Sequence, residues 1–172
     1  MPDTERDTPA LIASYANNAT GLITGQTHRD FVVTALGGYG SIRVVDGAAA
    51  QVLGTSFAKL TACTANGPAA SSVTPAHGSD EITAALAGVY EVSFHASYVA
   101  PAGRTVTFRL GVEDLEQPIG CQSGGGTEPQ HVNFADIVSL VAGQRVSVRA
   151  KADQAATSVT VRDASLRIKR IG

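Results

Sequence analysis

The stretch from Gly88 to Val112, GVYEVSFHASYVAPAGRTVTFRLGV, decides the fold. Apolar side chains occupy the even positions from Tyr90 to Tyr98, and polar side chains occupy the odd positions between them. The same alternation returns over residues 104–112. A period of two residues is that of a β-strand with one buried face. Residues 99–103 hold a proline and a glycine, which favour a turn, so the stretch predicts a long antiparallel hairpin.

The apolar face of this stretch gives the candidate core. Its members lie at even-numbered positions before and after the predicted turn. They include aromatic side chains, which bury the most surface. They are Tyr90, Val92, Phe94, Val106, Phe108 and Leu110. Arg109 has the opposite parity, so we expect its truncation to alter stability little.

Alternating runs continue on both sides, and no helical period survives after Ser41. The runs predict strands over residues 41–45, 57–62, 81–86, 89–98, 104–112, 117–122, 131–140, 144–152 and 157–170. Residues 67–78 and the glycine run 123–127 are predicted surface loops. The apolar parity changes within the last run, which predicts a bulge near Asp163. So many short strands need two sheets, and the chain is predicted to be all-β.

The first 40 residues have a different character. Residues 1–8 are polar and predict an extended arm, while 9–16 and 27–36 predict short helices. Helices of this length need a surface to pack on, either the sandwich or another chain. We therefore divide the chain into an attachment segment, 1–40, and a sandwich domain, 41–172. The candidate assembly contacts are the large apolar residues of the first segment: Leu11, Ile12, Tyr15, Leu22, Ile23, Phe31 and Val32.

Composition limits the classes of molecule that the chain is expected to bind. The 172 residues carry a net charge of -2, and the basic residues are scattered, so we expect no binding to nucleic acid. No apolar run is long enough to span a bilayer, and the acidic start does not resemble a signal peptide, so we expect no membrane partner and synthesis in a cytoplasm without export. Cys63 and Cys121 are then expected to be free thiols.

The sequence shows no motif for catalysis or for a cofactor. None of the four histidines has a second histidine or a cysteine two or four residues away, and no nucleophile motif of the common hydrolases is present. We expect no enzyme activity and no cofactor. Glu113, Asp114 and Glu116 form an acidic cluster that suits either calcium or solvated charge. Tyr39 and Tyr98 are the two candidates for an aromatic carbohydrate contact, although both also suit packing roles.

Two segments of the sandwich resemble a known family. Gly88-Val89-Tyr90-Glu91-Val92-Ser93-Phe94 resembles the Gly-x-Tyr strand of the jelly roll shared by tumour necrosis factor and the complement globular head. The segment 140–148, LVAGQRVSV, resembles its penultimate hairpin. The resemblance covers about residues 57–170 and implies an antiparallel jelly-roll β-sandwich that assembles as a homo-oligomer, with a trimer ranked above a dimer. The closing strand here lacks the aromatic residues of the animal proteins.

A second resemblance lies before the sandwich. The segments 19–24, ATGLIT, and 28–33, HRDFVV, look like a leader found ahead of a jelly roll in structural proteins of tailed bacteriophages. This resemblance implies a virion protein. Small single jelly rolls with an N-terminal arm are similar to capsid decoration, or cement, proteins, which bind across subunits of the major capsid protein on the capsid surface. The alternative is a tail fibre or baseplate tip protein whose jelly roll binds a host receptor or glycan.

Overall fold

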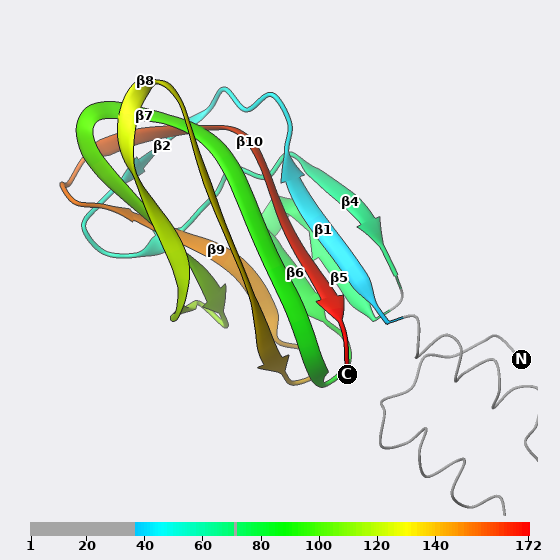
Figure 1. Ribbon diagram of the computed structural model, residues 1–172. Helices are drawn as coiled ribbons and strands as arrows, with labels where there is room; N and C mark the ends of the chain where they lie inside the picture. Colours follow the sequence, from blue (N-terminus) through cyan, green and yellow to red (C-terminus); the bar gives the residue numbers. More distant parts are fainter. Residues whose placement is uncertain (1–36, 71) are drawn as a thin grey trace, which may run out of the picture.

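A computed structural model describes residues 37–70 and 72–172 of the chain (Figure 1). Apart from one 3₁₀ turn, η1 (His77–Ser79), its elements are all strands, which confirms the predicted all-β class. The strands are β1 (Tyr39–Val44), β2 (Ala50–Leu53), β3 (Ala58–Lys59), β4 (Ala65–Ala69), β5 (Val73–Ala76), β6 (Glu81–Ala84), β7 (Gly88–Val112), β8 (Leu115–Leu140), β9 (Arg145–Ala152) and β10 (Thr157–Arg170). The predicted arm, both predicted helices and all seven candidate assembly contacts lie outside the described residues. The first strand begins at Tyr39, inside the predicted attachment segment.

Two long strands, β7 and β8, hold the two layers of the sandwich together. Residues 90–99 of β7 pair with β10, whereas residues 106–112 pair with β9. The first layer therefore has the order β4-β1-β10-β7, and the second has β5-β6-β9-β7. β8 follows β7 through both layers, and Figure 1 shows the two strands bending over together at the end of the molecule opposite the C-terminus. β2 extends the pairing of β10, and β3 that of β9.

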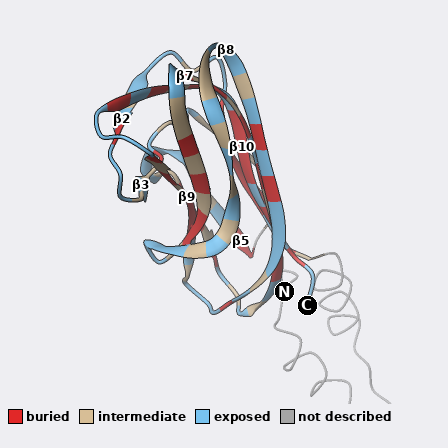
Figure 2. Cartoon of the chain, turned by 60° about the vertical axis from the view of Figure 1, so that its left-hand side comes forward, coloured by how far each residue is buried: buried red, intermediate tan, exposed pale blue. Residues whose placement is uncertain are grey.

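The core lies between the layers and is built from the predicted face of β7. All six predicted core residues are buried. Figure 2 shows the buried segments of the strands in red. The Phe108 ring lies 5.9 Å from the ring of Phe94 and 5.2 Å from that of Tyr98, centroid to centroid. The Tyr98 hydroxyl donates a hydrogen bond to the Ser123 carbonyl at 3.0 Å, so a polar group that is buried keeps a partner.

The predicted pairing of residues 88–98 with 104–112 is wrong. Both segments belong to β7, and both pair with β8 instead. The turn of the hairpin is at Glu113 and Asp114, whose φ angles of +49° and +62° suit a two-residue turn between Val112 and Leu115. Residues 101–104 form a bulge at the bend, because Ala100 pairs with Gly126 and Thr105 already pairs with Gly124. A proline fits there because bulged residues need not donate to the ladder.

The prediction that residues 123–127 hold no regular structure is also wrong, because they lie inside β8. The strand needs glycine at this bend for a steric reason. A Cβ atom on Gly125 would collide with the carbonyl oxygen of Pro101, so the two backbones approach closely only with glycine present. The glycine run thus marks the bend of a strand and not an irregular loop.

Other differences concern short strands. Residues 67–78, predicted to be one loop, hold the end of β4, all of β5 and the first two residues of the turn η1. β2 was not predicted, because its four residues lack a clear alternation. The bulge predicted near Asp163 is confirmed by a register shift between Val161 and Asp163 in the pairing with β7.

The position of Phe108 between the layers gives a stability prediction. Phe108→Ala should lower the free energy of unfolding by about 3–5 kcal/mol, because it removes a buried ring and leaves a cavity among other rings. Arg109→Ala is the control on the opposite face of β7. Its guanidinium lies 4.9 Å from the centre of the Phe57 ring, a contact worth about 0.5–1 kcal/mol at an exposed site. Urea unfolding followed by circular dichroism measures both, and equal losses would contradict this description of the core.

Candidate functional site: a basic groove over β4, β1 and β10

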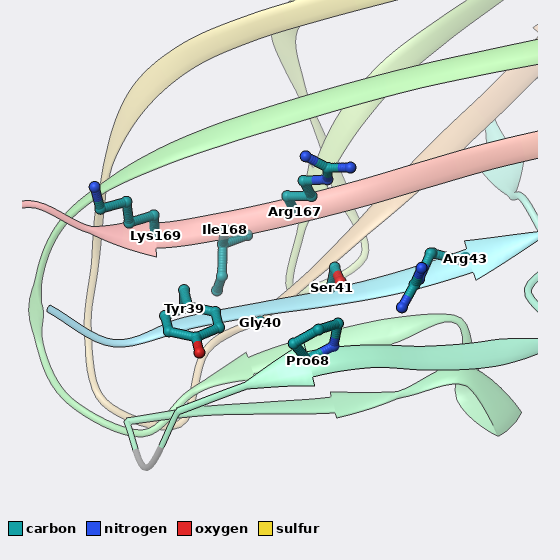
Figure 3. Close-up of a pocket in the computed structure, with 8 residues that line it drawn as sticks. All are labelled: Tyr39, Gly40, Ser41, Arg43, Pro68, Arg167, Ile168 and Lys169. Carbon is teal, nitrogen blue, oxygen red and sulfur yellow. The ribbon is translucent and has the colours of Figure 1, made fainter.

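A groove of about 420 Å³ lies on the outer face of the first layer. We call it the basic groove. It is lined by three adjacent strands, β4, β1 and β10 (Figure 3). The lining residues are Tyr39, Gly40, Ser41, Arg43, Pro68, Arg167, Ile168 and Lys169.

Strand register places the functional side chains of the basic groove. Tyr39, Ser41 and Arg43 share the outward parity of β1, while Ile42 and Val44 between and beyond them are buried in the core. Antiparallel pairing sets Tyr39 opposite Lys169 and Ser41 opposite Arg167. Cross-strand neighbours lie on the same face of a sheet, so residues more than 120 positions apart become adjacent.

The β4 side of the basic groove depends on an irregular edge strand. The register between β1 and β4 shifts between Gly40 and Ile42, which leaves Gly67 and Pro68 in a bulge. Proline fits an edge strand because its missing N–H is not needed by a further neighbour. A Cβ atom on Gly67 would collide with the Ser41 hydroxyl and press on the Arg43 guanidinium. Gly67 therefore allows the Arg43 side chain to lie close against β4.

Among the described residues, no ion pair compensates the charge of the basic groove. Its three cations are Arg43, Arg167 and Lys169, and none of the described residues that line it is a carboxylate. None of the ion pairs between described residues involves these three side chains. Arg167 donates one hydrogen bond, from Nε to the Ser165 hydroxyl at 3.2 Å. The remaining N–H groups are available to an anionic ligand, for which arginine offers paired donors.

The structure separates the two tyrosines predicted as candidate carbohydrate contacts. Tyr39 is 47 % exposed at the basic groove, whereas Tyr98 is fully buried beside Phe108. Tyr98 is therefore excluded as a ligand contact. The cations of the basic groove could not be predicted from the sequence, because their grouping depends on which strands pair.

The acidic cluster of the turn between β7 and β8 binds cations of the protein itself. Asp114 Oδ1 lies 3.5 Å from Lys59 Nζ and 3.4 Å from Arg149 Nη1. Glu113 accepts a hydrogen bond from the backbone N–H of Arg145, which lowers the pKa of that carboxyl. We use the name ion network for six residues: Lys59, Glu81, Glu113, Asp114, Arg145 and Arg149. In the part of the chain that the structure describes, no group of three or more His, Cys, Asp or Glu side chains is placed to hold a metal ion.

Glu81 is the buried member of the ion network. Its side chain is only 8 % exposed and binds Lys59 Nζ, while Arg145 Nη1 lies 3.5 Å from its second oxygen. The hydrogen bond to Glu81 is the main cause of the raised pKa of Lys59. The ion network thus joins β3, β6, β9 and the turn between β7 and β8. This arrangement suits a structural role.

The two cysteines are free, as predicted. Burial raises the pKa of the Cys63 thiol to about 12, and it also raises the pKa of Cys121. Both thiols are therefore protonated at neutral pH, which disfavours nucleophilic chemistry because the thiolate is the reactive form. Among residues 37–70 and 72–172, no helix is both long and apolar enough to cross a membrane.

Comparisons with known proteins identify the fold. No protein-family model matches the chain, and no curated protein sequence matches it. Among solved structures, the chain is similar to Eiger TNF from S. frugiperda, with a TM-score of 0.56, 14 % identity and coverage of 78 % of this chain and 93 % of that one. The globular domain of zebrafish complement 1qA gives a TM-score of 0.56, 16 % identity and coverage of 79 % and 98 %.

Murine APRIL is a third similar structure, with a TM-score of 0.52, 12 % identity and coverage of 77 % of this chain and 98 % of that one. At these identities the likeness establishes the fold alone. It confirms the antiparallel jelly-roll sandwich that the segments 88–94 and 140–148 predict. The described structure therefore has the jelly-roll fold of the tumour necrosis factor and complement globular-head proteins.

The burial of Glu81 gives a prediction for the ion network. Glu81→Gln should lower the free energy of unfolding by about 1–3 kcal/mol. Breaking a fully buried pair costs about 3–5 kcal/mol, and the partial exposure of the two cations reduces that value. Glu116→Gln is the matched control, because Glu116 is exposed and the substitution removes the same negative charge. Urea unfolding at low and high salt measures both variants. Equal effects of the two substitutions would contradict a structural role for Glu81.

Proposed function

We propose that this chain is a structural, non-catalytic virion protein that decorates and stabilises the capsid of a tailed bacteriophage. The observation that carries the proposal is the order of two features along the chain. The phage-like leader at residues 19–33 comes first, and the jelly roll begins soon after it, with β1 at Tyr39. This is the order that the leader resemblance implies for virion structural proteins.

In this proposal the two parts of the chain have different tasks. The part of the attachment segment that precedes β1 binds across neighbouring subunits of the major capsid protein, while the jelly roll stands outward on the capsid surface. The apolar residues from Leu11 to Val32 supply the contact area, since a stable interface buries on the order of 1,000 Å² or more. A rigid sandwich suits the outward part. Its two layers share the long strands β7 and β8.

The second candidate function is that of a tail fibre or baseplate tip protein, and the basic groove favours it. The groove is open on an outer sheet face and has uncommitted cations and an exposed tyrosine, which are features of a binding surface. A protein that binds a host receptor or glycan needs such a surface. A capsid decoration protein does not need a ligand-binding surface of this kind.

Stoichiometry in the virion separates the two candidates. A decoration protein should be present at on the order of hundreds of copies, because a capsid repeats its sites by symmetry. A tail tip should be present at a few tens of copies at most. Gel densitometry of purified virions against the major capsid band measures the ratio. A low ratio would exclude capsid decoration and favour the tail.

Removal of the attachment segment should abolish capsid binding but leave the sandwich folded. Deleting residues 1–36 keeps all the described strands, so circular dichroism of the variant should remain that of a β-protein. A protein that binds only the assembled capsid also stabilises it, so undecorated particles should lose DNA at a lower temperature. Phe31→Ala should weaken binding, with Asp30→Ala as a neighbouring polar control. Full binding by the deletion variant would refute the proposed attachment.

We further propose that the chain is a homotrimer, ranked above a dimer. The support is the assembly that the resembling jelly rolls imply, together with the economy of a cyclic oligomer that uses one type of interface repeatedly. Light scattering at micromolar concentration should give about three times the chain mass of 17.6 kDa. A mass of two chains would favour a dimer, and the mass of one chain would leave assembly to the capsid alone.

A further inference from the structure

The basic groove has the size of a small-ligand site. Its volume of about 420 Å³ lies within the roughly 300–1,000 Å³ that is usual for such sites. Figure 3 shows Tyr39, Ser41 and Arg43 following one another along β1, with Pro68 on β4 to one side and Arg167 and Lys169 on β10 to the other. Three strands of one rigid sheet thus place every lining side chain.

The charges of the basic groove select an anionic ligand. Three cations and no acidic side chain are found among the described residues that line it, and the acidic residue nearest in register, Glu91, lies on β7 opposite Lys169. No ion pair between described residues joins Glu91 to Lys169. The planar guanidinium of arginine binds a carboxylate through two parallel hydrogen bonds, and a neutral ligand would leave these donors unused.

The apolar part of the basic groove indicates that the ligand is larger than a simple anion. The exposed ring of Tyr39 and the ring of Pro68 offer flat apolar surfaces beside the cations. An inorganic anion gains nothing from them. A sugar ring gains contact through its C–H groups, while one of its hydroxyls can bond to the Tyr39 phenol. Exposed tyrosine combines apolar contact with a polar tip.

An extended polyanion fits the surface less well. Binding along a nucleic-acid strand or an acidic peptide requires cations spread over many residues. The three cations of the basic groove lie within a few residues of one another in β1 and β10. Outside the groove, Lys59, Arg145 and Arg149 belong to the ion network, and Arg109 and Lys151 lie over the Phe57 ring. A compact ligand with one anionic group and one ring accounts for the whole lining.

We propose that the basic groove binds a carboxylate-bearing sugar residue, with its carboxylate on Arg43 or Arg167 and a face of its ring against Tyr39 and Pro68. Uronic acids and sialic acids share this chemistry. The inference names a ligand class for the second candidate function, and its biological role rests on that function. Sugar binding by the purified chain is measured independently of the copy number in the virion. The proposed ligand and the proposed location in the virion can therefore be refuted separately.

The test is a titration of the full chain, followed by NMR or calorimetry, with five probes. They are a glucuronic-acid oligosaccharide, sialyllactose, neutral lactose, a glutamate-rich peptide and a short thymidine oligonucleotide. We expect saturable binding of at least one acidic sugar and at least tenfold weaker binding of lactose. Equal binding of lactose, tighter binding of the peptide or the oligonucleotide, or no saturable binding of either acidic sugar would overturn the proposal.

Variants locate the site. Arg43→Gln or Arg167→Gln should reduce affinity for the acidic sugar about tenfold, and Tyr39→Ala should reduce it by a similar factor. Arg104→Gln is the matched control, because it removes the same charge from β7, outside the groove lining. Arg167→Lys, which keeps the charge but not the paired donors, should recover binding only in part. Thermal melting checks that each variant is folded. Equal loss in Arg104→Gln, or no loss in any groove variant, would refute the assignment.

Discussion

The antiparallel pairing of β7 with β8 is the constraint on which the rest of the structure depends. It runs from the pair Gly88 and Leu140 to the pair Val112 and Leu115, interrupted only by register shifts. Both strands change layer at the same place, so each contributes an inward face to both sheets. Phe94 and Phe108 come from the two halves of one strand and meet across the core. The sandwich is therefore closed by continuous backbone on this side, and its two sheets cannot shift against each other there without breaking many hydrogen bonds.

The parts of the fold that the sequence predicted are those set by local periodicity. The alternation from Tyr90 to Tyr98 identifies the buried face correctly, because it depends only on the pleat of a strand. The hairpin assignment failed at residues 99–103 because proline and glycine are compatible both with a turn and with a bulge at a bend. The true turn, Glu113-Asp114, lacks glycine altogether. Local residue preference cannot distinguish a reversal of the chain from a change of layer when the pairing partner is unknown.

The candidate site was predictable only in part, for a related reason. Tyr39 could be identified by residue type, but its exposure and that of Tyr98 differ because of their positions in the sheet. Arg43 and Arg167 become neighbours only through the pairing of β1 with β10, which joins distant parts of the chain. Pro68 reaches the same groove through a bulge in an edge strand that the sequence analysis placed in a loop. A composite surface of this kind carries no signal in the linear order of residues.

The central position of β10 has a consequence for how the protein acquires its shape. This strand, formed by residues 157–170, lies between β1 and β7 in the first layer. During synthesis on the ribosome, β1 emerges with one edge unpaired and stays without this neighbour until residues 157–170 have been made. Contacts of such long sequence separation slow folding, because a large loop must close before they form. The nascent chain therefore remains incompletely paired until β10 has been made, and during this interval its unpaired strand edges favour aggregation at high expression levels.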